Sequence, residues 1–132
     1  MKQPIEAKVT FKHNFDGELE LREGSVSIGM LPHQASPYKL LQAALISCFH
    51  STFLEIIEKK RLSVESVSYH SSGFKRDEVP ATIETLHMDI HVKGIQNKVA
   101  VEKSFELASK VCSVYTTISQ VGTITYTIHY LD

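Results

Sequence analysis

The chain has 132 residues, of which 42% are apolar and 22% charged, and its formal net charge is −1. This length suits one domain, residues 1–132, with its own hydrophobic core, and the near-neutral charge argues against nucleic acid as a partner. No apolar stretch approaches the ~20 residues of a membrane span, and the first ten residues lack the apolar run of a secretory signal, so we expect a cytoplasmic protein with no membrane partner.

The first thirty residues predict an antiparallel meander of short strands. Apolar and polar residues alternate over 5–13 and again over 15–23, which is the period of a half-buried strand. We expect a third short strand over 25–28.

A long helix is predicted over 37–60, with Ser36 as N-cap and Pro37 at the first helical position. Apolar residues recur at helical spacing and predict one buried face. This face consists of Leu41, Ala44, Leu45, Cys48, Thr52, Phe53, Ile56 and Ile57. At 1.5 Å per residue the helix is about 33 Å long, which is more than one small sheet covers. We therefore expect a homodimer whose sheets share the covering.

The rest of the chain predicts a strand pair, a second helix and a closing strand. The ranges are 62–76 and 82–94 for the pair, 97–111 for the helix with Asn97 as N-cap, 112–120 for a turn or short helix, and 122–131 for the last strand. Strands grouped around two helices indicate the α+β class.

Two histidines, His87 and His91, fall on one face of the second strand of this pair, and we expect them to face solvent. The chain contains no Cys-x-x-Cys or His-Glu-x-x-His pattern. The sequence therefore predicts no metal site and no cofactor.

The two cysteines, Cys48 and Cys112, raise the main functional question. A cysteine on the buried face of a helix is either a small core residue or a reactive thiol. The spacing of the residues leaves both alternatives open.

Two short stretches resemble the OsmC/Ohr family of hydroperoxide-reducing proteins. They are "SPYKLLQAALISC" (36–48) and "CSV" (112–114), and they stand in the order and separation of the family's two cysteine motifs. The resemblance implies an OsmC-like intertwined homodimer with antiparallel sheets around two central helices. It also implies a thiol peroxidase of the oxidative stress response, in which Cys48 attacks an organic hydroperoxide, Cys112 resolves the intermediate as a disulfide, and an external dithiol is the reductant.

The sequence departs from that family at the groups that activate the nucleophile. Tyr38 stands at the position of the family's glutamate and is followed by Lys39, and the N-terminal turn at 11–18 contains no arginine. A buried thiol ionises poorly, so Cys48 needs a positive partner. The available cations are Lys12, His33, Lys39 and His50. Tyr38, Lys39 and His50 are the candidates for lining a substrate pocket.

These departures leave three functions open. The chain is a peroxidase, or a non-enzymatic protein of the same fold that binds a small apolar ligand at the dimer interface, or a structural dimer without a pocket. Ser113 also stands where the family usually has proline.

Overall fold

The computed structural model describes residues 1–132 and contains three helices and six strands. The elements are β1 (Val9–Phe11), β2 (Asp16–Glu20), β3 (Ser25–Gly29), α1 (Pro37–Lys59), β4 (Ser66–Lys75), β5 (Ile83–Lys93), α2 (Lys98–Val111), α3 (Ser113–Ser119) and β6 (Thr123–Leu131). Each predicted strand and helix has a counterpart, and the α+β class is confirmed. The chain divides into two compact units, Met1–Ala43 and Ala44–Asp132. A single domain over 1–132 stays a prediction.

The N-terminal unit is the predicted antiparallel meander, in which β1 pairs with β2 and β2 with β3. The buried Gln34 side chain ties the meander together: its Nε2 donates to Asp16 Oδ1 at 2.9 Å and to Ser27 Oγ at 3.2 Å. Its Oε1 accepts the Leu31 N–H at 3.2 Å. A Cβ atom on Gly29 would clash with the Gln34 amide, so this close approach requires glycine.

Most large apolar side chains of this unit are exposed. They are Met1, Ile5, Val9, Phe11, Phe15, Leu21, Met30, Leu31, Tyr38 and Leu41. The Phe11 and Phe15 rings stack on each other at 5.6 Å between centroids. The N-terminal unit of one chain therefore builds a hydrogen-bonded frame with very little core.

The C-terminal unit contains the second sheet, in the order β4–β5–β6. β4 and β5 are antiparallel, but β5 and β6 are parallel. The expectation of antiparallel sheets is therefore wrong for this pair. The reason is the connection: α2 and α3 carry the chain back along the sheet before β6 begins, as a parallel crossover requires.

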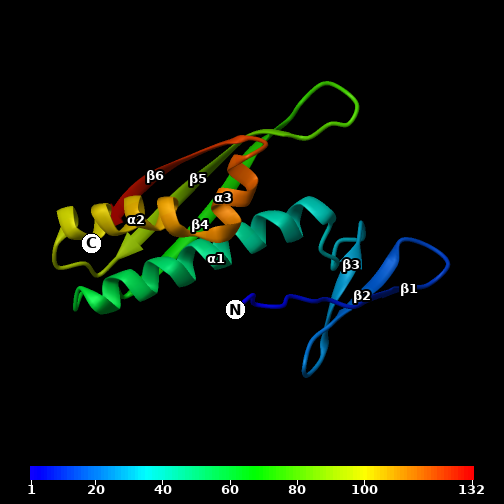
Figure 1. The fold of residues 1–132 in the computed structure, drawn as a ribbon, viewed down its shortest axis with the longest axis horizontal. Coiled ribbons are helices and arrows are strands. Elements are labelled where there is room, and N and C mark those ends of the chain that lie inside the picture. The colour runs from blue at the N-terminus through cyan, green and yellow to red at the C-terminus, as the bar shows by residue number, and fades with distance from the viewer. The chain divides into compact units, whose positions relative to one another are not determined.

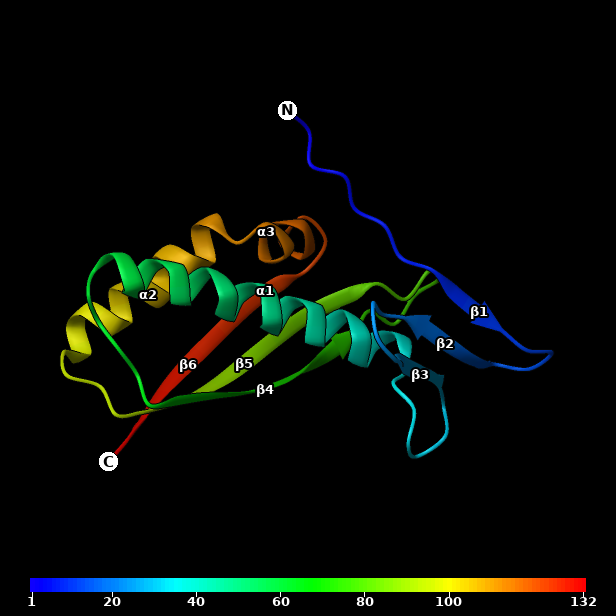
Figure 2. The ribbon, with the colours of Figure 1, turned by 90° about the horizontal axis from the view of Figure 1, so that it is seen from below.

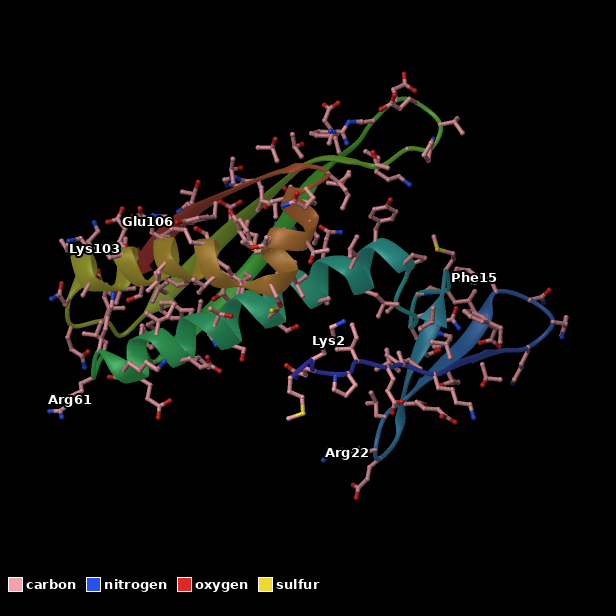
Figure 3. The ribbon with its side chains drawn as sticks, viewed as in Figure 1. Lys2, Phe15, Arg22, Arg61, Lys103 and Glu106 are labelled. Carbon is pink, nitrogen blue, oxygen red and sulfur yellow. The ribbon has the colours of Figure 1, made fainter.

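All three helices cover one face of this sheet (Figures 1 and 2). Alternate residues of β5 point into the core between the layers and are buried, namely Leu86, Met88, Ile90 and Val92. α2 adds Val101, Phe105 and Ala108 to this core, while Lys103 and Glu106 are exposed on the same helix (Figure 3).

The buried face of α1 differs from the predicted one. Its fully buried residues follow an i, i+4 ridge and are Leu45, Phe49, Phe53 and Ile57. Cys48, Thr52 and Ile56 lie half-buried on the flank of this ridge, and Leu41 and Ala44 are exposed. The sequence pattern missed Phe49 because apolar residues occupy more than one side of the helix.

Because α1 is apolar on more than one side, its overall composition is strongly apolar. α1 is long and apolar enough, by length and composition alone, to cross a membrane, contrary to the expectation from its sequence. The core helix of a soluble protein passes the same test, and the ridge of α1 packs in the core of the C-terminal unit.

Candidate functional site

The two cysteines of the chain lie next to each other in the C-terminal unit. Cys48 occupies the middle of α1, and Cys112 is the residue between α2 and α3. The Cys112 thiol donates a hydrogen bond to Cys48 Sγ across 3.3 Å, and both side chains are free thiols. A disulfide bond is about 2.05 Å long, so at 3.3 Å the two sulfurs are in contact but not joined.

Cys112 owes its position to a sharp change of backbone direction. Its φ and ψ are −70° and 121°, so it is extended between two helices. Its N–H bonds to Ala108 O at 2.9 Å and closes α2, while its carbonyl accepts the Thr116 N–H at 3.0 Å and opens α3. This turn brings α3 beside the middle of α1 (Figures 1 and 2), where the start of α3 meets Cys48.

Hydrogen-bond donors surround the Cys48 sulfur. Burial raises the pKa of this thiol, but the backbone N–H of Val114, the Cys112 thiol, and the hydroxyl and N–H of Ser113 together outweigh burial and lower the pKa below its ordinary value. The Ser113 Oγ lies 3.9 Å from Cys48 Sγ. The first N–H groups of a helix have no partner within the helix, so those of α3 are free to donate to the sulfur.

Cys112 has the opposite character. It is 1% exposed, and burial raises its pKa, although the Tyr115 N–H offsets part of the effect. Donating its proton to Cys48, and the negative charge of that thiolate, raise the pKa further. The pair is therefore asymmetric: Cys48 is the half-exposed and more acidic thiol, and Cys112 is the buried and less acidic thiol that donates to it.

Aromatic packing sets the separation of the helices that carry the two sulfurs. Phe49, next to Cys48 in α1, stacks on Phe105 of α2 at 6.0 Å and on Tyr115 of α3 at 5.6 Å between ring centroids. Phe53 stacks on Phe105 at 3.8 Å with an interplanar angle of 3°. These rings clamp α1 against α2 and α3, because close-packed rings tolerate little displacement.

His50 does not face the cysteine pair. Its Nδ1 bonds to the Tyr69 hydroxyl of β4 at 2.9 Å, and the two rings meet edge to face. Burial lowers the pKa of His50, so the ring is a poor cation. The donors that lower the pKa of Cys48 within this chain are uncharged groups of α3 and Cys112, and a positive partner for Cys48 stays a prediction.

The other predicted pocket residues belong to the N-terminal unit. Tyr38 and Lys39 lie exposed in the first turn of α1. Arg22, the arginine of the N-terminal strands, lies in the turn between β2 and β3 (Figure 3). A role for Tyr38, Lys39 and His50 in a substrate pocket stays a prediction.

The histidines of β5 lie on the sheet face away from the helices. His87 bonds to Thr125 Oγ1 at 2.7 Å, and His91 stacks on His129 at 4.6 Å between ring centroids. His129 Nε2 lies 3.0 Å from Asp89 Oδ1, and this hydrogen bond is the main cause of the lowered Asp89 pKa. The chain contains no group of three or more His, Cys, Asp or Glu residues arranged to hold a metal ion.

A shallow groove of about 320 Å³ runs between α1 and α2 near the cysteine pair. Its apolar lining residues are Ile56, Leu107 and Val111, and its rim carries Thr52, Glu55, Lys59 and Lys60. Thr52 Oγ1 donates to the Cys48 carbonyl at 3.0 Å, so the groove begins one helical turn from the sulfur.

The sequence reasoning placed both cysteines but missed the donors around them. The signal for Ser113 was present, since its hydroxyl follows Cys112 directly in the chain. No local signal marks the Val114 N–H, because a backbone donor has no side-chain signature.

Comparison with known families gives a match that spans most of the chain. The family model for OsmC-like proteins matches residues 31–127, a range that contains both cysteines. The chain belongs to the OsmC-like protein family. A comparison with curated proteins found no match.

Several solved structures share the OsmC-like fold of this chain. A hypothetical protein from Aquifex aeolicus VF5 has a TM-score of 0.83 at 19% identity, covering 99% of this chain and 100% of its own. An organic hydroperoxide resistance protein OsmC from Legionella pneumophila has a TM-score of 0.72 at 18% identity, with coverages of 96% and 98%. The organic hydroperoxide resistance protein OhrB of Bacillus subtilis has a TM-score of 0.67 at 14% identity, with coverages of 95% and 98%.

Proposed function

We propose that this OsmC-like protein is a thiol-dependent peroxidase that reduces organic hydroperoxides through Cys48 and Cys112. The observation that carries the proposal is the 3.3 Å separation of the two sulfurs, with Cys112 donating to Cys48. Membership of the OsmC-like family and the fold shared with proteins named for organic hydroperoxide resistance support the same reaction class.

The first step is attack of the Cys48 thiolate on the distal peroxide oxygen. An S–O bond forms to the oxygen that carries the proton, and the O–O bond breaks, so the sulfur is oxidised to a sulfenic acid. The alkoxide that leaves takes one proton from solvent and becomes an alcohol. The half-exposed position and lowered pKa of Cys48 suit this residue to the attack, because the thiolate is the nucleophile.

The second step joins the two cysteines. The Cys112 sulfur loses its proton and attacks the Cys48 sulfenic acid, the S–S bond forms, and the oxygen leaves as water. An external dithiol then reduces the disulfide by exchange, which restores both thiols and leaves the dithiol oxidised. Burial of Cys112 suits it to this role, since a protonated and inaccessible thiol does not compete for the peroxide.

We also propose that the working form is a homodimer. Large apolar side chains are exposed on α1 and α2 in a single chain, namely Leu54, Val99, Leu107 and Val111, in addition to those of the N-terminal unit. Exposed apolar surface of this kind marks an interaction site. Size-exclusion chromatography with light scattering tests this state, and a monomer at every concentration would contradict it.

Thiol counting in single turnover gives a sharp test of the peroxidase proposal. Reduced, desalted protein is mixed with cumene hydroperoxide, and free thiols are titrated. We expect the wild type to lose both thiols and form an intramolecular disulfide, Cys112→Ser to lose one thiol and hold a sulfenic acid that dimedone traps, and Cys48→Ser to consume no peroxide.

Ser47→Ala is the matched control, because Ser47 precedes Cys48 on α1 and its hydroxyl bonds only to the Ala44 carbonyl. It should behave as wild type. The proposal fails when the wild type, supplied with excess dithiothreitol, consumes no cumene hydroperoxide above the rate of dithiothreitol alone.

The groove between α1 and α2 favours a second candidate, a non-enzymatic protein that binds a small apolar ligand. Its apolar lining of Ile56, Leu107 and Val111 can hold such a ligand without chemistry at Cys48. In that case an apolar fluorescent probe binds the wild type and Cys48→Ser equally, and the Cys48 thiol titrates at or above its ordinary pKa.

A further inference from the structure

Ser113 presents its hydroxyl to the reactive sulfur. Its Oγ lies 3.9 Å from Cys48 Sγ, and this is the one side-chain hydrogen bond that Ser113 makes in the structure. The backbone of Ser113 is fixed on both sides, because Cys112 is bonded to Ala108 and the Ser113 carbonyl accepts the Thr117 hydroxyl at 2.9 Å. The hydroxyl therefore stays at the sulfur without a side-chain competitor.

The groups that donate to Cys48 are all uncharged, and this gives the Ser113 hydroxyl a role in stabilising the thiolate. The donors that lower the pKa of Cys48 are the N–H groups of Ser113 and Val114, the Cys112 thiol and the Ser113 hydroxyl, and none of them carries a charge. An uncharged donor next to a thiolate makes a charge-assisted hydrogen bond, which is stronger than a bond between neutral groups. The hydroxyl of Ser113 is also the one donor of this set that a side-chain substitution removes without touching either cysteine.

We propose that Ser113 is a catalytic residue whose hydroxyl donates a hydrogen bond to the Cys48 thiolate and holds it ready for attack. The catalytic role of this hydrogen bond rests on the proposed peroxidase function, but the hydrogen bond itself can be tested without any peroxide. When the thiolate becomes a sulfenic acid and then a disulfide, the sulfur loses its negative charge and the bond weakens. The hydroxyl thus stabilises the reduced enzyme in its reactive form.

A series of substitutions at Ser113 separates the donors. Ser113→Ala removes the hydroxyl and keeps the N–H, Ser113→Thr keeps both, and Ser113→Pro removes both. Proline is tolerated at the first position of a helix, which Ser113 occupies in α3, and the side chain is exposed, so each variant should fold. Ser119→Ala is the control, because Ser119 ends the same helix and donates to Tyr115 O at 2.7 Å, not to Cys48.

The measurement is alkylation of Cys48 by limiting iodoacetamide across pH, followed at the Cys48 peptide by mass spectrometry. We expect the midpoint of the Ser113→Ala profile to move to higher pH and its rate well below the midpoint to fall about three- to tenfold. Ser113→Pro should move further in the same direction, while Ser113→Thr and Ser119→Ala should match the wild type. The midpoint of the profile is the deciding quantity, not the rate. The intrinsic nucleophilicity of a thiolate rises with its pKa, which partly offsets the fall in rate.

Two results overturn the assignment: a Ser113→Ala midpoint equal to that of Ser119→Ala, or a Ser113→Thr midpoint that moves as far as that of Ser113→Ala. Alkylation needs no peroxide, so the two proposals fail separately. If the wild type reduces no hydroperoxide but Ser113→Ala shifts the midpoint, the peroxidase proposal falls and the hydrogen bond stands. If the wild type reduces hydroperoxide and Ser113→Ala leaves the alkylation profile and rate unchanged, the peroxidase proposal stands and the role assigned to Ser113 falls.

Discussion

The N-terminal unit buries one large apolar side chain, Ile28, whereas the C-terminal unit buries a cluster of fourteen residues between its sheet and helices. The first is held by strand pairing and by Gln34, and the second by interlocking aromatic rings. Both cysteines lie in the second unit. The two sulfurs therefore stand in the unit with the larger core, where close packing holds side chains at fixed separations. A unit held mainly by hydrogen bonds opens locally more easily.

The largest expected effect comes from the aromatic core. Phe53→Ala should lower the free energy of unfolding by about 3–5 kcal/mol, because it leaves a cavity beside Phe105. Urea unfolding measures this change. Leu54→Ala is the control, since Leu54 is 42% exposed and should cost far less. Equal effects of the two substitutions would mean that a partner surface covers Leu54.

The next effect tests the frame of the N-terminal unit. Gln34→Ala removes the donor to Asp16 and Ser27 and leaves half-buried polar groups unpaired, which should cost about 1 kcal/mol. We expect faster amide exchange in β2 and β3 with little change in β5. His33→Ala, an exposed neighbour, should change neither. Uniform loss of protection in both sheets would show that the two units unfold as one.

A helix cap gives an effect of similar size in the C-terminal unit. Asn97 Oδ1 accepts the Ala100 N–H at 3.0 Å, as the sequence predicted. Asn97→Ala should lower stability by about 1 kcal/mol in thermal or urea unfolding, and Asn97→Ser should restore most of it. A neutral Asn97→Ala would indicate that packing alone fixes the start of α2.

The smallest effect is a pH dependence. Burial lowers the pKa of His50 below its unfolded value of about 6.5, so below that pH the unfolded chain binds more protons than the folded one. The His50 contribution is therefore complete above the unfolded pKa and is lost as pH falls toward the folded one. As pH falls through this window, the urea concentration at the unfolding midpoint of the wild type should decrease. His50→Gln should make this decrease with pH smaller. An unchanged decrease would assign it to the other histidines.

Much of the architecture followed from local signals in the sequence. Alternating residues located the strands, and Pro37 and Asn97 marked the starts of the two long helices. The parallel pairing of β5 with β6 did not follow, because strand direction depends on how the intervening helices cross the sheet. Phe49 was also missed, since α1 is apolar on more than one side.

By itself, the sequence pointed to two cysteines, Cys48 in the middle of one predicted helix and Cys112 directly after another. Only the tertiary structure decided that they meet at 3.3 Å, that Cys48 is the more acidic of the two, and that backbone and hydroxyl donors of α3 are responsible. The physical reason is that acidity of a thiol depends on the groups that surround it in space. Here those groups come from a helix that begins 65 residues further along the chain.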